Sequence, residues 1–255
     1  MKDPLPLSRT FGDKRVDEQE RERGIRGVFE AVAPRYDLMN DLMSLGIHRW
    51  WKRCLVRMAA PAAGQTIIDL AGGTGDVAAR MAGPDRKVTV VDPSPAMMAV
   101  GRARGLDQVA WQVGTAEHLP LADASVDTLT MAFGIRNATR VDNALVEILR
   151  VLKPGGRLLC LEFSTPAVWL RPAYRLFSFQ VIPRLAAWIT GSPQAYTYLV
   201  ESIRRFPDQP TFARQIEEAG FTGVDFSNLS FGIACIHVGI CPARPVDREH
   251  PSASS

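Results

Sequence analysis

The sequence predicts an α/β fold built on a mainly parallel sheet, and three observations support this prediction. Residues 66–81 have the pattern of a buried strand that ends in a glycine-rich turn and leads directly into a helix. Strand-like and helix-like segments then alternate as far as residue 163, which is typical of βαβ units and a parallel sheet covered on both faces. Two strand-like runs near the C-terminus are separated by only a short turn, which favours an antiparallel hairpin.

The glycine-rich turn predicts a nucleotide-cofactor site. Gly72, Gly73 and Gly75 allow the backbone to turn sharply and approach a ligand closely, and the next helix begins with unpaired N–H groups. Residues 73–78 also fit the pattern G-x-G-x-x-A of NAD-binding folds. A tight turn without a ligand is the third interpretation, so the turn alone does not identify the cofactor.

The remaining elements follow at regular spacing. Short β-branched or apolar runs alternate with amphipathic stretches, and turn residues separate them. We expect strands at 88–91, 109–113, 126–132 and 157–163, helices at 94–104, 143–152 and 210–219, and a final strand pair at 223–229 and 231–241.

Composition limits the class of protein. A chain of 255 residues with 46% hydrophobic and 22% charged residues is long enough for one large domain. The net charge of +3 is small and dispersed, which argues against a nucleic-acid partner. Four cysteines lie far apart without a C-x-x-C pair, so we expect reduced thiols in a cytosolic protein and no metal site. The N-terminus lacks the apolar core of a signal peptide, and no apolar stretch reaches 18 residues, so we expect no membrane span.

Two residues near the turn are candidates for cofactor contacts on position alone. Asp92 ends the second strand, where an acidic side chain in a doubly wound sheet accepts hydrogen bonds from ribose hydroxyls. Its alternative role is a favourable charge at the start of the next helix. Thr74 lies within the turn, where its hydroxyl can meet the cofactor or simply stabilise the turn.

Longer motifs resemble one family. Five parallel strands closed by a hairpin resemble the class I S-adenosylmethionine-dependent methyltransferase fold, a Rossmann-like seven-stranded sheet. Within that fold, the sequence is similar to the UbiE/COQ5 family of C-methyltransferases in ubiquinone and menaquinone biosynthesis. The blocks that carry this resemblance lie at residues 28–52, 69–76, 133–137, 150–164 and 198–209.

The resemblance implies both a reaction and a set of site residues. The reaction is methylation of a ring carbon in a polyprenylated quinol, either 2-polyprenyl-6-methoxy-1,4-benzoquinol or demethylmenaquinol, with S-adenosylmethionine as the cofactor. The residues implied to surround the cofactor are Asp69, Gly72, Gly73, Thr74, Gly75, Asp92, Thr115, Ala116 and Ala132. Those implied in catalysis are Arg136, Asn137, Tyr36 and Asp37.

The chemistry explains why these residue types are expected. A ring carbon becomes nucleophilic when the adjacent phenol loses its proton, so the enzyme must stabilise a phenolate beside a sulfonium. Arginine keeps its proton at neutral pH, so Arg136 is suited to hold a water molecule or the developing oxyanion, with a structural salt bridge as the alternative. Tyr36 and Asp37 belong to a segment expected to fold over the pocket, unless they serve only as a helix cap. Histidine is the residue type suited to act as a base near neutral pH, but His48, among aromatic and basic neighbours, is expected to pack or to form an interface instead. His118 is expected to be an exposed loop residue and not a catalyst.

The expected organisation is one methyltransferase domain over 25–242. It carries a helical cap at 25–60 and a helical lid insertion at 166–206, with a flexible tail at 1–24 and a disordered tail at 243–255. Aromatic and arginine residues alternate over 167–190, which indicates either an amphipathic packing helix or a lid that accepts the polyprenyl tail at the inner face of a membrane. The sequence leaves open a homodimer and a quinone-synthesis complex.

Two other functions remain open at this stage. An NAD-dependent oxidoreductase fits the glycine pattern but not the hairpin, and a non-catalytic component of a quinone-synthesis complex would keep the fold without the reaction.

Overall fold

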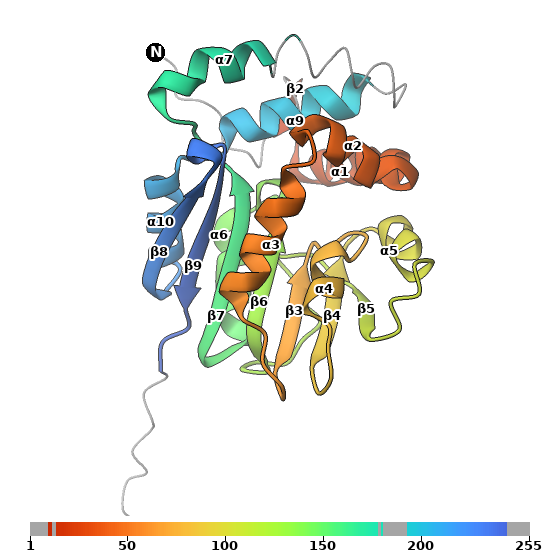
Figure 1. Ribbon diagram of the computed structural model, residues 1–255, viewed down its shortest axis with the longest axis vertical. Helices are drawn as coiled ribbons and strands as arrows, with labels where there is room; N and C mark the ends of the chain where they lie inside the picture. The colour runs from red at the N-terminus through yellow and green to blue at the C-terminus, as the bar shows by residue number, and fades with distance from the viewer. Residues whose placement is uncertain (1–9, 12–13, 178–179, 181–192, 244–255) are drawn as a thin grey trace, which may run out of the picture.

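A seven-stranded sheet forms the centre of the computed structural model, which describes residues 10–11, 14–177, 180 and 193–243. The strand order is β5-β4-β3-β6-β7-β9-β8, with β9 antiparallel to both of its neighbours and the other pairs parallel (Figure 1). The strands are β3 (Thr66–Leu70), β4 (Lys87–Asp92), β5 (Val109–Val113), β6 (Val126–Ala132), β7 (Leu152–Phe163), β8 (Thr222–Leu229) and β9 (Ala234–Ile240). A separate short hairpin joins β1 (Thr10–Phe11) to β2 (Lys14–Arg15).

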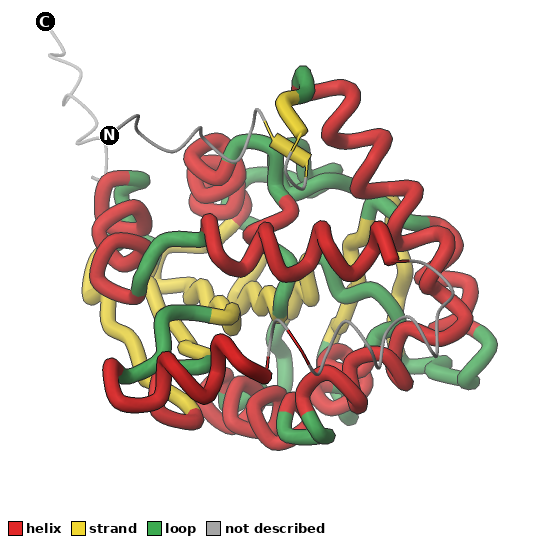
Figure 2. The backbone as a smooth tube through the Cα atoms, turned by 90° about the horizontal axis from the view of Figure 1, so that it is seen from above, coloured by secondary structure: helices red, strands yellow, loops and turns green. Residues whose placement is uncertain are grey.

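Helices cover both faces of the sheet and one of its edges. Figure 1 shows α3 and α4 in front of the sheet, α6 and α10 behind it, and α1, α2, α7 and α9 above the carboxyl ends of the parallel strands. Figure 2, seen from above, shows helices crossing over that edge. The helices are α1 (Glu18–Val32), α2 (Tyr36–Ser44), α3 (His48–Ala59), α4 (Asp76–Met81), α5 (Pro95–Arg102), α6 (Val141–Val151), α7 (Arg171–Leu176), α9 (Pro193–Arg205) and α10 (Gln209–Glu218).

The side-chain alternation along the strands divides the core in two. In β7, Leu158 and Cys160 pack on the face covered by α6 and α10, whereas Leu159 and Leu161 pack on the face covered by α3 and α4. This period of two follows from the pleat of a strand, and both sets are apolar because both faces are buried. The sheet is therefore rigid beneath the edge at which its parallel strands end.

The predicted seven-stranded sheet with an antiparallel C-terminal hairpin is confirmed. The strands at 109–113 and 126–132 have the predicted bounds. Two bounds differ. β7 begins at Leu152, because Leu152 pairs with Val126 before the chain bulges through a glycine turn and resumes the ladder at Arg157. β9 begins at Ala234, because the expected start of that strand is a 3-10 turn over Ser230–Gly232.

The N-terminal region is more ordered than the sequence indicated. The expected flexible tail over 1–24 is wrong for its last residues, since α1 begins at Glu18 with a capping box between Asp17 and Glu20. The expected helical cap over 25–60 is also not one unit: α3 packs against β6, β7 and α4 and is part of the core. The amphipathic stripe of α3 carries Trp51 and Leu55, both essentially buried.

The expected lid insertion is described in part. Its described helices are α7 and α9, while Phe179, Arg184 and Trp188 lie outside the described residues, as does the expected tail from residue 244. Among the helices that the structure describes, none is long and apolar enough to cross a bilayer.

Candidate functional site

Three adjoining cavities lie along the carboxyl edge of the sheet. The first, which we call the edge cavity, has a volume of about 120 Å³ and is bounded by Asp92 and Ser94 after β4, Gly73 of the glycine turn, and Phe29 and Tyr36 of the N-terminal helices. The bridging cavity, of about 40 Å³, lies beside it. The apolar cavity, of about 630 Å³, lies beneath α7 and α9.

Shared wall residues connect the three cavities in series. Phe29, Tyr36 and Phe133 line both the edge cavity and the bridging cavity. Phe163 and Leu199 are among those that line both the bridging cavity and the apolar cavity. The small bridging cavity therefore lies between the edge cavity, which contains the Asp92 carboxylate, and the large apolar cavity.

Asp92 is the buried acidic group of the edge cavity. Its carboxylate accepts a hydrogen bond from Gly73 N–H at 2.8 Å and one from Ser94 N–H at 2.8 Å. Burial raises the pKa of Asp92 to about 6, although both backbone donors oppose that shift. A carboxylate has capacity for about four hydrogen bonds, so Asp92 can accept further donors from a ligand. Its alternative role at the start of α5 belongs to Ser94, whose hydroxyl caps the helix at Met97 N–H.

The glycine turn contributes one face of the edge cavity through Gly73. Gly72 and Gly75 do not line it; each is required by a close approach instead. A Cβ on Gly72 would lie 2.7 Å from Asp69 Oδ2, and a Cβ on Gly75 would lie 2.7 Å from the Trp111 ring. Gly75 also has a φ of 76°, a backbone region that favours glycine.

Asp69 lies beneath the turn, and its implied cofactor contact is not found. Its carboxylate accepts from Ala78 N–H at 3.0 Å and from the Thr130 hydroxyl at 3.0 Å, which joins β3, α4 and β6. Burial raises its pKa to about 7. The Ala78 N–H group near the start of α4 is thus used by Asp69, which corrects the expectation that this N–H group faces a ligand.

The other implied cofactor residues divide into two groups. Thr115 and Ala116 line the edge cavity, as expected from the third strand. Thr74 does not line it, because its hydroxyl faces Asp37 Oδ1 at 3.3 Å. Ala132 packs instead against the core on the α3 face, and its neighbours Met131 and Phe133 line the cavity.

Arg136 is buried in the wall of the bridging cavity. Its Nη1 donates to Glu162 Oε1 at 2.8 Å and to the Phe133 carbonyl at 2.5 Å, and its guanidinium lies 5.6 Å from the Phe163 ring centroid. Burial raises the pKa of Glu162, while the Arg136 cation opposes the shift. Within the described part of the chain, Nε of Arg136 has no hydrogen-bond partner. The structural salt bridge and a free donor atom therefore coexist in one side chain.

Asn137 is held between two parts of the chain that lie far away in sequence. Its Oδ1 accepts from the Tyr198 hydroxyl of α9 at 2.9 Å. Arg21 of α1, only 1% exposed, donates to the Asn137 carbonyl at 3.0 Å and to the Arg136 carbonyl at 3.2 Å. The 3-10 turn Ile135–Asn137 is thus fixed by side chains from α1 and α9.

Tyr36 and Asp37 have different positions. Tyr36 lines both the edge cavity and the bridging cavity. Asp37 lines none of the three cavities. Its carboxylate forms an ion pair with Arg104 and accepts a hydrogen bond from the Thr74 hydroxyl. Of the two residues, only Tyr36 lines a cavity at this edge of the sheet among the three described above.

His48 lines the bridging cavity, whereas sequence reasoning favoured a packing or interface role for it over that of a base. Its Nε2 lies 3.1 Å from Asp41 Oδ1, and its Nδ1 is buried without a partner among the described residues. Trp51 and Lys52 follow His48 by three and four residues, so all three side chains lie on the same face of α3. This face therefore contributes both to the core and to the cavity wall.

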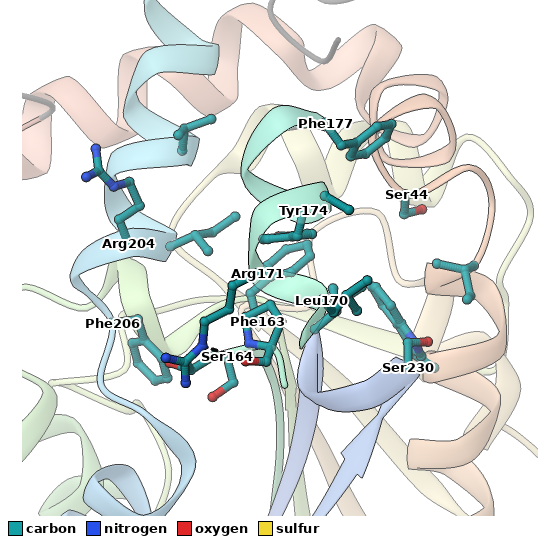
Figure 3. A pocket seen from close by; sticks show the side chains of 18 of the residues that line it. Ser44, Phe163, Ser164, Leu170, Arg171, Tyr174, Phe177, Arg204, Phe206 and Ser230 are labelled. Atoms are coloured by element: carbon teal, nitrogen blue, oxygen red, sulfur yellow. Dashed lines mark hydrogen bonds between the residues drawn. The ribbon is translucent and has the colours of Figure 1, made fainter. Parts of the chain in front are cut away.

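The apolar cavity is bounded mainly by aliphatic and aromatic side chains. In Figure 3, Tyr174 and Phe177 of α7 and its C-terminal end, Phe206 after α9, and Ser230 of the hairpin turn surround it. Arg171 and Arg204 are the charged groups in its wall. Several residues of this wall and of the edge cavity carry no sequence signal, because only the fold brings them together; among those not predicted are Glu22, Arg26, Phe29, Met97, Met131 and Thr139.

Within the described residues, no group of His, Cys, Asp and Glu side chains could hold a metal ion. The four cysteines are free, and three of them are buried.

A model of the ubiE/COQ5 methyltransferase family matches residues 15–241. The chain belongs to the ubiE/COQ5 methyltransferase family. It is 74% identical over 239 residues to the ubiquinone/menaquinone biosynthesis C-methyltransferase UbiE of Rubrivivax gelatinosus, a match that covers 94% of this chain and 95% of that protein. It is 49% identical to the protein of the same name from Caulobacter vibrioides, with 91% and 97% covered.

Solved structures of methyltransferases share the fold of this ubiE/COQ5 family member. A Thermotoga maritima S-adenosylmethionine-dependent methyltransferase has a TM-score of 0.61 at 22% identity, covering 85% of this chain and 99% of that one. The phosphoethanolamine N-methyltransferase 2 of Haemonchus contortus, solved in complex with S-adenosylmethionine, has a TM-score of 0.57 at 14% identity, with 76% and 52% covered. Family membership and the antiparallel β9 together decide against the NAD-dependent oxidoreductase.

Proposed function

We propose that this methyltransferase transfers the methyl group of S-adenosylmethionine to a ring carbon of a polyprenylated quinol, either a 2-polyprenyl-6-methoxy-1,4-benzoquinol or a demethylmenaquinol. The observation that carries the proposal is the series of three cavities. A cavity that holds the Asp92 carboxylate for a nucleoside, a small aromatic-lined cavity for a planar ring and a large apolar cavity for a hydrocarbon tail lie in that order. The names of the relatives that are 74% and 49% identical support the same substrate class.

The edge cavity fits the cofactor on the chemistry of its donors and acceptors. Asp92 is an acceptor for ribose hydroxyls, and Gly73 leaves the backbone close to the ligand. Thr115 and Ala116 line the part beyond β5, where the adenine would lie. When bound, S-adenosylmethionine supplies an electrophilic methyl group on a sulfonium.

The bridging cavity holds groups suited to a quinol ring. Phe29, Phe133 and Phe163 offer flat apolar surfaces, which orient a ring and exclude water. Arg136 has an unpartnered Nε–H donor in this part of the structure, which can stabilise the phenolate oxygen as its negative charge develops. Tyr36 lines both the edge cavity and the bridging cavity, so its side chain can contact the quinol ring and the cofactor at the same time.

The apolar cavity and its surroundings support a tail that enters from a lipid surface. Five exposed apolar side chains, which we call the apolar rim, lie in or next to the segments that bound this cavity: Leu45, Val168, Trp169, Leu176 and Phe231. The rings of Trp169 and Phe231 contact each other edge to face, with their centroids 5.1 Å apart. Arg171 and Arg204 add positive charge that suits an anionic lipid surface. Peripheral contact with the membrane at this rim explains how a polyprenyl substrate reaches the passage.

A methylation assay tests the proposal. Purified protein is incubated with isotopically labelled S-adenosylmethionine and with short-chain forms of both quinols under reducing conditions, and the products are identified by mass spectrometry. We expect a gain of one methyl group on the ring carbon of at least one quinol. No ring methylation of either quinol by protein that binds the cofactor would contradict the proposal and would favour the non-catalytic role.

A further inference from the structure

The bridging cavity must supply a proton acceptor if a quinol is to become a phenolate there. Its described lining includes four side chains of ionisable type, Tyr36, His48, Arg136 and Tyr198, besides the neutral polar side chains of Asn40 and Ser44. Arg136 is a permanent cation paired with Glu162, and the Tyr198 hydroxyl donates to Asn137 with its pKa raised by burial. A tyrosine ordinarily keeps its proton at neutral pH, which leaves the imidazole as the group with an available lone pair.

The contact with Asp41 fixes the tautomer of His48. Arg49 donates to both carboxylate oxygens of Asp41, which holds the pKa of that carboxyl below its ordinary value. An ionised carboxylate only accepts hydrogen bonds, so Nε2 of His48 must carry the hydrogen that it donates at 3.1 Å. In the neutral ring, Nδ1 then carries the lone pair.

His48 is neutral in the unliganded protein. Burial, helped by the neighbouring Lys52 cation, lowers the pKa of His48 to about 4, against the opposing pull of Asp41 and Asp76. The side chain is only 7% exposed, and within the described residues Nδ1 has no partner. A buried acceptor without a partner costs about 1–3 kcal/mol, a cost that persists until a donor enters the cavity.

We propose that His48 is the general base that accepts the quinol hydroxyl proton at Nδ1, and that Asp41 is the positioning residue that sets its tautomer. This inference rests on the proposed quinol methylation. Its distinguishing observation is a buried imidazole nitrogen that has no hydrogen-bond partner among the described residues, on a side chain that lines the bridging cavity between the edge cavity and the apolar cavity.

The proton and electron balance is complete without a further reactant. The hydroxyl proton passes to Nδ1 of His48, and the electron pair left on oxygen makes the adjacent ring carbon nucleophilic. That carbon forms a bond to the methyl carbon while the methyl–sulfur bond breaks with its electron pair left on sulfur. The ring carbon then loses its hydrogen as a proton to solvent, the aromatic ring is restored, and the quinol oxygen recovers a proton from His48.

Two side chains, Asp41 and Arg136, support this proton transfer between the quinol hydroxyl and the imidazole. Asp41 stabilises the imidazolium that forms, as an orienting carboxylate does in other histidine bases. Arg136 lines the same cavity, and its Nε–H, which has no partner among the described residues, is a donor for the oxygen that loses the proton. One residue of this cavity thus offers an acceptor for the hydroxyl proton, and another offers a donor to the resulting oxyanion.

The test compares turnover with binding in His48→Ala and His48→Gln. We expect kcat for quinol methylation to fall by about 10²–10⁴-fold in both variants, the range for loss of a general base, while the Kd for S-adenosylmethionine measured by calorimetry stays unchanged. Added imidazole is expected to restore part of kcat in His48→Ala only. Asp41→Asn is expected to lower kcat in the same direction, with partial recovery in Asp41→Glu.

The matched control is His237→Gln. His237 is also buried with an unpartnered Nδ1 among the described residues, and its Nε2 contacts the Gln209 carbonyl at 3.0 Å, but it lines none of the three cavities. We expect this variant to lose stability in thermal unfolding and to retain kcat per folded molecule.

The outcomes separate this inference from the proposed function. Wild-type protein that methylates no quinol overturns the proposed function. Wild-type protein that methylates a quinol, together with a folded His48→Gln variant of undiminished kcat, overturns the role of His48 alone. A fall in kcat that imidazole does not rescue, and that Asp41→Asn does not reproduce, also contradicts it.

Discussion

At the scale of single residues, the buried polar atoms at the carboxyl edge differ in how far the protein itself satisfies them. Asp69 uses both carboxylate oxygens within the protein and holds the glycine turn in place. Asp92 has one backbone donor on each oxygen and further capacity, and Nδ1 of His48 and Nε of Arg136 have no partner among the described residues. Asp92, His48 and Arg136 line cavities, whereas Asp69 does not. Unfilled hydrogen-bonding capacity alone does not identify a ligand site, because His237 also has an unpartnered Nδ1 among the described residues and lines none of the three cavities; it is the combination with a cavity wall that points to a ligand.

The pH dependence of cofactor binding should report on Asp92. Its pKa of about 6 in the free protein means that it is ionised above that pH and protonated below it. Ribose hydroxyls donate to the ionised form, so affinity should be constant above about pH 7 and weaken below pH 6, by at most tenfold per pH unit. Calorimetric titration with S-adenosylmethionine between pH 5 and 8 measures this.

Asp92→Asn is the control for that titration. The amide keeps one acceptor oxygen and does not titrate, so we expect weaker binding, by roughly 10- to 100-fold, without the acid loss. Glu22, Arg26 and Glu117 remain in the same cavity wall in both proteins. An equal acid loss in Asp92→Asn would exclude Asp92 as its cause.

Sequence reasoning placed Asp92, Thr115 and Arg136 in cavity walls but misplaced Asp69 and Ala132. Position at a strand end is visible in a sequence, and it was sufficient for Asp92. Whether a side chain then faces a ligand or a neighbouring strand depends on contacts such as that between Asp69 and Thr130, which are 61 residues apart. For His48, the sequence favoured packing over a role as a base, because neither its contact with Asp41 nor the absence of a partner for Nδ1 among the described residues can be read from the sequence.

At the scale of elements, α5 and the glycine turn pack through glycine positions that leave no room for a side chain. A Cβ on Gly101 of α5 would lie 2.1 Å from the Trp111 ring and 2.9 Å from the Thr74 carbonyl. Gly27 in α1 has the opposite surroundings, with no atom within 4 Å of its Cβ position. Glycine is thus required by close packing at position 101 but not at position 27, and only the structure distinguishes the two cases.

Alanine at these two glycines should change stability in opposite directions. Gly101→Ala forces the rigid Trp111 ring and the turn to move, so we expect a loss of about 1–3 kcal/mol in the free energy of unfolding. Gly27→Ala replaces a flexible residue inside an exposed stretch of helix, so we expect a gain of about 0.5–1 kcal/mol. Urea denaturation followed by circular dichroism measures both, and a shift of the two variants in the same direction would contradict this account.

The elements themselves were largely predictable, and the exceptions have physical causes. The strands at 109–113 and 126–132 have clear β-branched or apolar runs bounded by polar or glycine turns. The start of β7 was missed because Pro154 and Gly155 are typical of a turn, while Leu152 still pairs with β6 across the bulge. The start of α1 was missed because its sequence is highly charged, and its helical order depends on contacts of Arg21 with the Arg136–Asn137 turn.

At the scale of the whole molecule, apolar surface is concentrated at one end. The side chains of the apolar rim are 57–76% exposed and lie in or next to the segments that bound the apolar cavity. Phe231 is 68% exposed with a φ of 57°, a strained conformation for an aromatic residue, and Trp51 Nε1–H holds the adjacent Ser230 hydroxyl at 2.9 Å. The hairpin turn is thus fixed in a geometry that projects an aromatic ring outward.

Replacing the two aromatic residues of this rim should weaken membrane binding. In a flotation assay with anionic vesicles, we expect Trp169→Ser/Phe231→Ser to lower the bound fraction at least tenfold, because each ring contributes about 1.5–3 kcal/mol when buried in lipid. Val146→Ser is the matched control, since Val146 is 56% exposed but lies on α6 behind the sheet. Equal flotation of the double variant and the wild type would exclude the rim as the contact surface.

The contacts of Arg21 also set an order in time. Its hydrogen-bond acceptors, the carbonyls of Arg136 and Asn137, lie 115 and 116 residues further along the chain. At ribosomal rates, α1 leaves the exit tunnel on the order of ten seconds before its partners do. The first helix to be synthesised is therefore among the last to dock. A chain interrupted before Tyr198 contains the five parallel strands β3 to β7, but it lacks the contact by which α9 holds Asn137 above their carboxyl ends.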